Sequence, residues 1–256
     1  MKSHRLPLAI ALIFVASYGG QTTGQDNASS ATKRLYERTG NESTVTGTIN
    51  VVGEVPKPLR IDMSADPVCT QLNPTAKTEL VVSSGGKLQN VFVYVKGGPL
   101  ETYRFERDSD DAAVLRHQNC RYSPHVLGVR VGQPLMIENG DPTTHNTHPS
   151  TMNNREWNQS MPPGGSLPVK YFERPEAFIP FKDNQHPWEK AYVGVFDHPF
   201  FAVSNELGSY KIQGLPPGTY TLVAWHERLG EKSIEITIVP GEIRNLDFAF
   251  DVSEKK

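Results

Sequence analysis

The sequence predicts an all-β protein, and three observations support this prediction. Runs of β-branched and aromatic residues recur along the chain, as in VTGTINVVG (residues 45–53) and LQNVFVYVKGG (residues 88–98), which is typical of strands. Glycine and proline, at 21 and 20 of the 256 residues, break these runs as turns do. Beyond an apolar run at the N-terminus, no segment shows helical periodicity over more than a turn or two. We therefore expect many short strands at the spacing of β-sandwiches.

The N-terminus has the pattern of a signal peptide. The basic start MKSHR is followed by the apolar run LPLAIALIFVASY and then by small residues. This apolar run is about thirteen residues long, shorter than the ~20 residues that cross a bilayer. We therefore predict that residues 1–20 are a signal peptide and that the protein is periplasmic or extracellular, with no membrane attachment beyond this signal. An uncleaved membrane anchor is the alternative.

The rest of the sequence divides into a polar segment and three runs of strands. Residues 21–44 are polar and poor in aliphatic side chains, which predicts a flexible linker. We expect N-terminal strands over residues 45–110, a second β unit over residues 111–200 and a final β segment over residues 201–252. The final segment contains three predicted strands, at about 209–213, 219–226 and 233–239. Because it is short for an independent sandwich, we expect it to share a sandwich with the N-terminal strands.

Charge and motif content exclude several classes of function. The formal net charge is −2 and no basic block is present, so a nucleic-acid partner is not expected. The sequence has no glycine-rich phosphate loop, no nucleophile elbow and no HExxH motif. His226 and Glu227 are adjacent, but neighbours on a strand point to opposite faces, so they are not expected to act as an acid–base pair. We therefore predict that the protein is not an enzyme.

The two cysteines, Cys69 and Cys120, predict a disulfide bond. In an exported protein a single pair of cysteines favours a disulfide over two free thiols. Closing a loop of about fifty residues would stabilise the fold by roughly 4 kcal/mol in the chain-entropy model. A cysteine-based metal site is the alternative, but neither cysteine lies near the histidine-rich segments in the sequence.

Two short segments carry candidate metal ligands. TTHNTHP contains His145 and His148, and DNQHPWE contains His186 between the carboxylates of Asp183 and Glu189. In DNQHPWE the three donors fall at i, i+3 and i+6, a spacing at which one loop can turn them towards one point. Imidazole suits borderline metals, and carboxylates suit harder ions.

The order and flanks of these segments resemble the copper-binding core of cupredoxins, most closely the amicyanin-like kind. DPTTHNTHPS followed by FKDNQHPWEKAYVGVF is similar to the pattern His-Asn-x-His, then Cys-x-x-His-Pro-x-Met, then a closing strand. The resemblance identifies His145 and His186 as the two histidine ligands and His148 as a non-ligand. Asp183 stands where the pattern has cysteine, and Glu189 stands where it has the axial methionine.

The resemblance implies copper binding and electron transfer with a periplasmic redox partner, but the two replacements change that expectation. A blue-copper site depends on a thiolate and a weak thioether, which suit both Cu(I) and Cu(II). Two imidazoles and two carboxylates favour Cu(II) or Zn(II), so efficient electron transfer and a strong blue colour are not expected. Two alternatives stay open: solvated carboxylates with no metal, or another ligand set that uses His148 or His198.

The C-terminal segment resembles a second family. GSYKIQGLPPGTYTLVAWHE is similar to the carboxypeptidase regulatory-like, transthyretin-type sandwich, and VTGTINVVGEVPKP is similar to the first strand of that sandwich. This resemblance implies a cupredoxin-like Greek-key unit set between the two parts of a smaller transthyretin-like sandwich. Such modules are generally non-catalytic. The alternative function is therefore a metal-free structural or binding protein whose partner is a protein or a carbohydrate.

Overall fold

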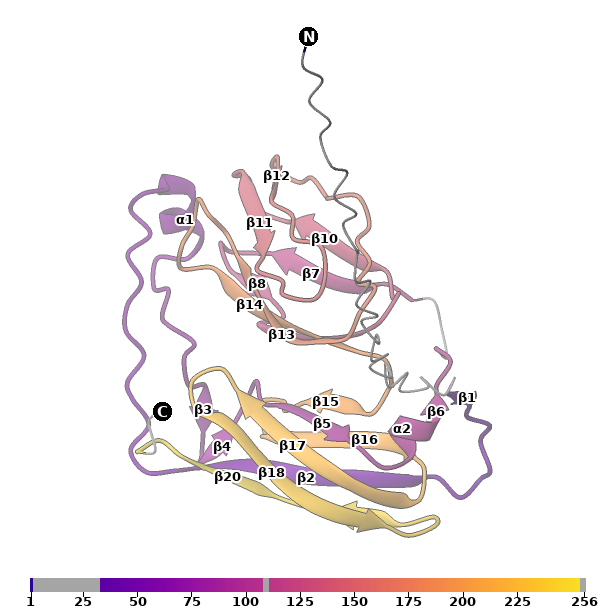
Figure 1. Cartoon of the computed structure of the whole chain (residues 1–256). Coiled ribbons are helices and arrows are strands. Elements are labelled where there is room, and N and C mark those ends of the chain that lie inside the picture. Colours follow the sequence, from indigo (N-terminus) through magenta and orange to yellow (C-terminus); the bar gives the residue numbers. More distant parts are fainter. Residues whose placement is uncertain (2–32, 108–110, 254–256) are drawn as a thin grey trace. The chain divides into compact units, whose positions relative to one another are not determined.

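The computed structural model describes Met1 and residues 33–107 and 111–253. The predicted signal peptide and the first part of the predicted linker, residues 21–32, lie outside this description. The all-β prediction is confirmed: within the described residues the only helices are α1 (Pro67–Leu72) and α2 (Pro99–Thr102), and every other element is a strand (Figure 1).

The first sandwich combines strands from both ends of the sequence. One sheet has the order β16-β2-β4-β3, with β19 and β20 also paired to β2, and the other has the order β15-β5-β17-β18. The strands of the first sheet are β2 (Ser43–Val52), β3 (Ser83–Ser84), β4 (Lys87–Leu88), β16 (Ser209–Leu215), β19 (Ile243–Asn245) and β20 (Phe248–Asp251). Those of the second are β5 (Phe92–Lys96), β15 (Phe201–Val203), β17 (Gly218–His226) and β18 (Gly230–Ile238). The C-terminal segment thus pairs with β2 and β5.

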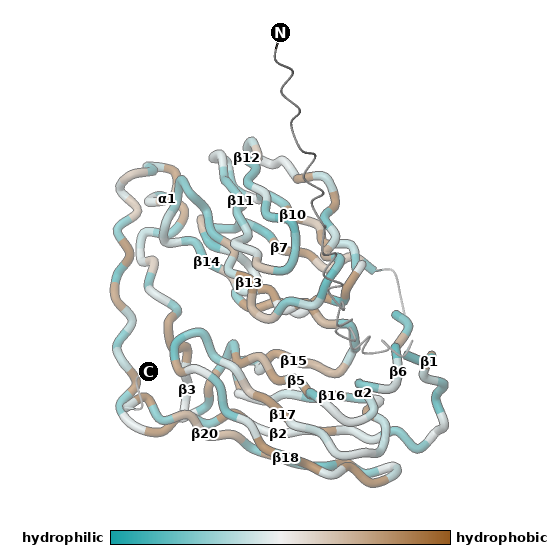
Figure 2. Tube along the Cα trace, viewed as in Figure 1, coloured by the Kyte–Doolittle hydropathy of each residue, from teal (hydrophilic) through white to brown (hydrophobic). Residues whose placement is uncertain are grey.

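The alternation of buried and partly exposed residues along the strands explains the core of the first sandwich. In β2, buried positions alternate with partly exposed ones, so that Val45 and Ile49 face the opposite sheet. They pack there with Tyr220 and Leu222 of β17. The alternation of hydrophobic and hydrophilic positions along these strands is visible in Figure 2.

The second sandwich lies between the two halves of the first in the sequence. Its three-stranded sheet consists of β7 (Ala113–His117), β8 (Tyr122–Ser123) and β10 (Leu135–Asn139), in the order β10-β7-β8. Its five-stranded sheet has the order β12-β11-β13-β14-β9. These strands are β9 (Val126–Arg130), β11 (His145–Pro149), β12 (Gln159–Met161), β13 (Glu176–Lys182) and β14 (Lys190–Phe196). Leu115, Ile137, Phe181 and Val193 belong to the core between the two sheets.

An aromatic layer joins the two sandwiches. Phe178 of β13 stacks on Trp225 of β17 with ring centroids 3.9 Å apart and an interplanar angle of 4°. Phe92 of β5 packs into the same layer. Gly128 on β9 allows the ring of Phe201 to lie close to the backbone of that strand, because a Cβ at Gly128 would overlap the ring.

Residues 59–78, here called the disulfide lobe, leave the first sandwich and pack against the second (Figure 1). The base of the lobe is closed by pairing of Arg60 with Lys77, and its tip carries α1. Cys69 of α1 is bonded to Cys120, with a Cα–Cα distance of 5.5 Å. The sequence prediction placed this region among the N-terminal strands, so the lobe is a feature that strand patterns did not reveal.

Part of the predicted flexible linker is folded. Within residues 33–44, β1 (Arg34–Leu35) pairs in parallel with β6 (Tyr103–Arg104). Tyr36 packs against the rings of Tyr103 and Phe105. Within residues 33–44 the predicted linker thus contains β1, the first two residues of β2 and the aromatic contacts of Tyr36.

Candidate metal centre

The candidate metal centre lies at one end of the second sandwich and consists of His145, His186, Asp183 and Glu189. His145 begins β11, Asp183 directly follows β13, and Glu189 directly precedes β14. All four side chains are buried, and none of the four residues is more than 3% exposed. The structure thus brings together the four residues that the sequence predicted as metal ligands.

The loop between β13 and β14 is held in a turn by hydrogen bonds to the side chain of Asp183. Asp183 Oδ1 accepts hydrogen bonds from the backbone N–H groups of Gln185 at 2.7 Å and His186 at 3.0 Å, which makes a tight Asx turn. The backbone N–H of Glu189 then donates to the carbonyl of His186 at 2.9 Å. These bonds turn the side chains at i, i+3 and i+6 towards the same interior point.

Ring nitrogens and carboxylate oxygens converge inside the centre. Asp183 Oδ2 lies 3.0 Å from His145 Nδ1 and 3.1 Å from His186 Nδ1. Glu189 Oε1 lies 3.1 Å from His145 Nδ1 and 3.8 Å from His186 Nδ1. Two donors bound to one ion at about 2.0–2.2 Å lie roughly 3 to 3.5 Å apart. Three of the four spacings fit this range, and the fourth, from Glu189 Oε1 to His186 Nδ1, is longer at 3.8 Å.

A further carboxylate contacts the Nε2 atom of each imidazole. Asp141 Oδ2 lies 3.0 Å from His145 Nε2, and Asp66 Oδ2 lies 3.0 Å from His186 Nε2. We call Asp66 and Asp141 the outer carboxylates. A hydrogen bond from Nε2–H to a carboxylate orients a metal-binding histidine and directs its Nδ1 lone pair at the ion.

The outer carboxylates are themselves fixed by backbone groups. Asp141 accepts hydrogen bonds from the backbone N–H groups of Asn119 at 2.7 Å and Cys120 at 2.8 Å. Asp66 caps α1, accepting from the backbone N–H of Val68 at 2.8 Å and, through its other oxygen, from the hydroxyl of Thr143 at 2.8 Å. Neither outer carboxylate was predicted: Asp66 lies far from His186 in the sequence, and Asp141, although only four residues before His145, has no place in the cupredoxin pattern.

One buried carboxylate oxygen makes no hydrogen bond of good geometry within the described part of the chain, although His145 Nδ1 lies 3.1 Å from it. It is Glu189 Oε1, which faces the two Nδ1 atoms. The other oxygen, Oε2, bonds to His117 Nδ1 at 2.8 Å. Leaving a buried carboxylate oxygen without a donor is costly. The position and charge of Oε1 therefore fit contact with a cation.

His117 is a residue of the site that sequence reasoning missed. It offers a nitrogen that lies within 4.8 Å of donor atoms on His145, Asp183 and Glu189, so it could replace His186 in a ligand set. However, its Nδ1 already bonds to Glu189 and its Nε2 to the hydroxyl of Thr147 at 2.9 Å. Its ring also stacks on His145 at 4.5 Å, nearly parallel. We therefore assign His117 to positioning Glu189; a lone histidine at a strand end gave no signal of this role.

The charge state of the centre follows from its carboxylates. Burial alone would lower the pKa of His145, but hydrogen bonds to Asp141 and Asp183 outweigh burial and raise the pKa to about 11. The pKa of His186 is raised for the same reason, through Asp183 and Asp66. Burial alone would raise the pKa of Asp183, yet hydrogen bonds from the two imidazoles hold it far below its usual range. The Asp183 carboxylate is thus ionised and requires positive charge beside it.

The two alternative histidine ligands lie elsewhere. His148 bonds to Glu156 Oε1 at 2.6 Å and to Asn184 at 3.3 Å on the partly exposed side of β11. His198 is buried after the end of β14 and accepts a hydrogen bond from the backbone N–H of Phe200 at 3.2 Å. Neither belongs to the groups of convergent donors found among the described residues.

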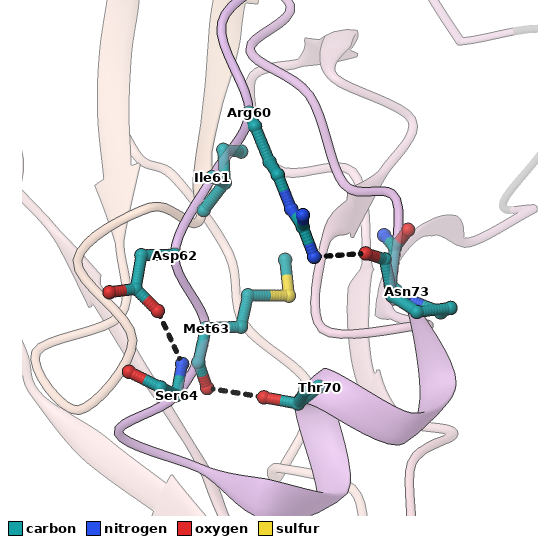
Figure 3. A pocket seen from close by; sticks show the side chains of 8 residues that line it. Arg60, Ile61, Asp62, Met63, Ser64, Thr70 and Asn73 are labelled. Atoms are coloured by element: carbon teal, nitrogen blue, oxygen red, sulfur yellow. Dashed lines mark hydrogen bonds between the residues drawn. The ribbon is translucent and has the colours of Figure 1, made fainter.

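A separate hollow of about 390 Å³ lies on the disulfide lobe. Figure 3 shows the side chains that line it. Arg60 donates to the carbonyl of Pro74 at 3.1 Å, and the Thr70 hydroxyl donates to the carbonyl of Met63 at 2.9 Å, both within the lobe. Asn73 donates to the carbonyl of Asn119, outside the lobe, at 3.2 Å. None of the four candidate ligands lines it, so the chemistry of the metal centre does not extend into this hollow.

Part of the chain is similar to several solved structures, whereas no protein-family model and no curated protein sequence matches it. A copper-containing nitrite reductase from Thermus scotoductus SA-01 is 16% identical over 33% of this chain and 22% of its own, with a TM-score of 0.31. An oxidised mutant of amicyanin is 18% identical over 35% of this chain and 86% of its own, with a TM-score of 0.30. A purple cupredoxin from Nitrosopumilus maritimus is 23% identical over 32% of this chain and 98% of its own, with a TM-score of 0.28. The chain thus spans about a fifth of the nitrite reductase, and similarities this low assign no function.

Proposed function

We propose that the chain binds one divalent metal ion, Cu(II) or Zn(II), through His145, His186, Asp183 and Glu189. The convergence of both Nδ1 atoms on the same two carboxylates supports this proposal most directly. Both Nε2 atoms are held by outer carboxylates, as is typical of metal-binding histidines. Oε1 of Glu189, which makes no hydrogen bond of good geometry within the described residues, faces the same point.

The residues of the centre fit a closed site better than a catalytic one. All four donors come from the protein and are buried, and catalytic metal sites keep a position open for water or substrate. Two imidazoles and two carboxylates hold Cu(II) or Zn(II) and hold Cu(I) poorly, because no sulfur is present. We therefore propose a non-enzymatic metal-binding protein in which fast electron transfer is impaired.

The cellular setting belongs to the same proposal. No helix in the described residues is long and apolar enough to cross a membrane. We propose an exported protein, periplasmic or extracellular, with a redox or structural protein partner and no nucleic-acid partner. We also propose that the first sandwich is the carboxypeptidase regulatory-like, transthyretin-type unit and that the second is the cupredoxin-like unit.

A metal-free structural or binding protein is the second candidate, and one observation favours it. With a pKa raised to about 11, His145 is protonated at neutral pH when no metal is bound. The resulting imidazolium pairs with Asp141 and Asp183, so ion pairs alone can close the same pocket.

Metal uptake separates the two candidates. Wild type, the double variant His145→Ala plus His186→Ala and the control His148→Ala would each be dialysed against Zn(II) and against Cu(II). Wild type and the control are expected to retain one ion per chain and the double variant none, because His148 belongs to the same motif but lies outside the centre. Equal uptake by all three proteins would contradict the proposal and favour the metal-free protein.

A further inference from the structure

The Cys69–Cys120 disulfide lies directly behind the two imidazoles of the metal centre. Cys69 Sγ, an Asp66 oxygen and a His186 nitrogen lie within 4.8 Å of one another. Cys120 Sγ, an Asp141 oxygen and a His145 nitrogen form a second such group. The fold therefore places each sulfur beside one histidine and one outer carboxylate, although the cysteines are far from both histidines in the sequence.

Hydrogen bonds tie each cysteine to its neighbouring histidine. The backbone N–H of Cys120 donates to Asp141 Oδ2 at 2.8 Å, and the same oxygen lies 3.0 Å from His145 Nε2. The backbone N–H of Cys69 donates to Asp66 Oδ1 at 3.3 Å, and Oδ2 of that residue lies 3.0 Å from His186 Nε2. In both arms an outer carboxylate links the backbone N–H of the cysteine to Nε2 of one imidazole, and from this we infer that the sulfurs lie on the Nε2 side of the rings.

Reduction would change the chemistry of this side of the centre. A dithiol reductant supplies two electrons and two protons: the S–S bond breaks, two S–H groups form, and the reductant closes to its own disulfide. Thiolates are the soft ligands that the Nδ1 side lacks. The Cα–Cα distance of 5.5 Å allows both side chains to reach one ion, because two sulfurs at about 2.3 Å from an ion lie at most ~4.6 Å apart.

We propose that reduction of Cys69–Cys120 creates a second metal site, selective for Cu(I), in which the two cysteine thiolates are the main ligands. On binding, the two thiols release two protons to solvent, and Cu(I) keeps its charge state. His145 and His186 are the neighbouring donors. The chain would then offer a hard site on the Nδ1 side when oxidised and a soft site on the Nε2 side when reduced.

The test is a comparison of Cu(I) affinity in the two redox states. The protein would be reduced anaerobically with dithiothreitol for long enough to open the lobe, because both cysteines are 0% exposed beneath Ile61, Leu72 and Trp188. After desalting, Cu(I) would be titrated in competition with a coloured Cu(I) chelator. Reduced wild type is expected to bind one Cu(I) at least about tenfold more tightly than oxidised wild type.

The double variant Cys69→Ser plus Cys120→Ser tests whether the sulfurs are the ligands. It is expected to bind Cu(I) no better than oxidised wild type, and Co(II) added to reduced wild type is expected to show a thiolate charge-transfer band that the variant lacks. Equal Cu(I) affinity of reduced wild type and this variant would overturn the proposal. Loss of the near-ultraviolet circular dichroism on reduction would also overturn it, because no folded soft site would exist.

A second double variant distinguishes failure of the thiolate site from failure of the proposed Zn(II) or Cu(II) site. Asp183→Asn plus Glu189→Gln removes both inner carboxylates and leaves both cysteines in place. When oxidised, it is expected to lose Zn(II) uptake; when reduced, it is expected to keep its Cu(I) affinity. Failure of Zn(II) uptake by oxidised wild type would count against the proposed function alone, and failure of Cu(I) uptake by the reduced protein would count against the thiolate site alone.

Discussion

Two buried histidines, one in each sandwich, differ in charge at neutral pH when no metal is bound: one is neutral and the other is positively charged. His226 in the first sandwich is 2% exposed and His145 in the second is 0% exposed. Burial lowers the pKa of His226 to about 4, and its neutral Nδ1 accepts hydrogen bonds from the backbone N–H groups of Arg228 and Leu229 at 3.1 and 3.3 Å. The pKa of His145 is raised to about 11, because carboxylates lie against both of its ring nitrogens.

The difference shows that neighbours, and not burial alone, decide what a buried histidine does. The first sandwich uses its histidine as a buried neutral acceptor for the backbone N–H groups of the turn after β17. The second gathers imidazoles and ionised carboxylates at one end of an otherwise apolar core. A buried cluster of ionised carboxylates requires compensating positive charge, which protons or a metal ion can supply.

The largest expected effect comes from replacing Asp183, whose Oδ2 lies within 3.1 Å of both imidazoles. Asp183→Asn should lower Zn(II) affinity by more than about 100-fold, since the effect of losing a ligand should exceed the 10–100-fold effect of losing an outer partner. Competition with a Zn(II) chelator would measure the affinity. The matched control is Glu156→Gln, which alters only the carboxylate beside the partly exposed His148. This variant should leave the Zn(II) affinity unchanged.

Replacing one outer carboxylate should have a smaller effect. Asp141→Asn leaves all four ligands in place but weakens the bond that orients His145, so Zn(II) affinity should fall about 10–100-fold. The same chelator competition applies. An affinity equal to that of wild type would show that Asp141 serves only the Asn119–Cys120 turn, whose backbone it also binds.

The neutral His226 of the first sandwich predicts that the free energy of unfolding falls as the pH is lowered. An unfolded histidine has a pKa of about 6.5, above the folded value for His226, so the unfolded chain takes up the proton first as pH falls. The stability that neutral His226 contributes is complete above about pH 6.5 and is lost progressively towards pH 4. Between pH 7 and pH 5, wild type should lose about 2 kcal/mol more unfolding free energy than His226→Asn.

Urea unfolding of metal-free wild type and His226→Asn at the two pH values would measure this loss. The asparagine oxygen can accept the same backbone hydrogen bonds but does not titrate. Parallel loss of stability in the two proteins would mean that His226 is already protonated in the fold, and the contrast with His145 would disappear.

The smallest effect is expected at His148. It lies in the same short motif as His145, yet it faces Glu156 on the partly exposed side of the strand. His148→Ala should leave Zn(II) affinity unchanged and change the unfolding free energy by no more than about 0.5 kcal/mol, as is usual for surface positions. A clear loss of Zn(II) affinity would assign His148 to the ligand set.

The parts of the centre that could be predicted from the sequence are those encoded within one short segment. Asp183, His186 and Glu189 lie in one seven-residue loop, and their i, i+3, i+6 spacing is visible without a fold. The alternation in residues 45–53 likewise predicted β2, because a strand with one buried face carries its pattern locally.

The remaining residues of the site depend on contacts between distant segments. Asp66 reaches His186 only because the disulfide lobe folds against the second sandwich, and His117 reaches Glu189 from another sheet. A single aspartate or histidine has no pattern that reveals such a partner. The distance in sequence between the cysteines and the histidines argued against a shared site, yet the fold places them within 4.8 Å.

X-ray absorption at the zinc edge of the oxidised, Zn(II)-loaded protein would test the central proposal most directly. Two imidazoles and two carboxylates predict four nitrogen and oxygen donors at about 2.0–2.2 Å, with the imidazole scattering of two histidines and no sulfur. A sulfur donor at about 2.3 Å, or failure of the folded protein to retain Zn(II) at all, would contradict it.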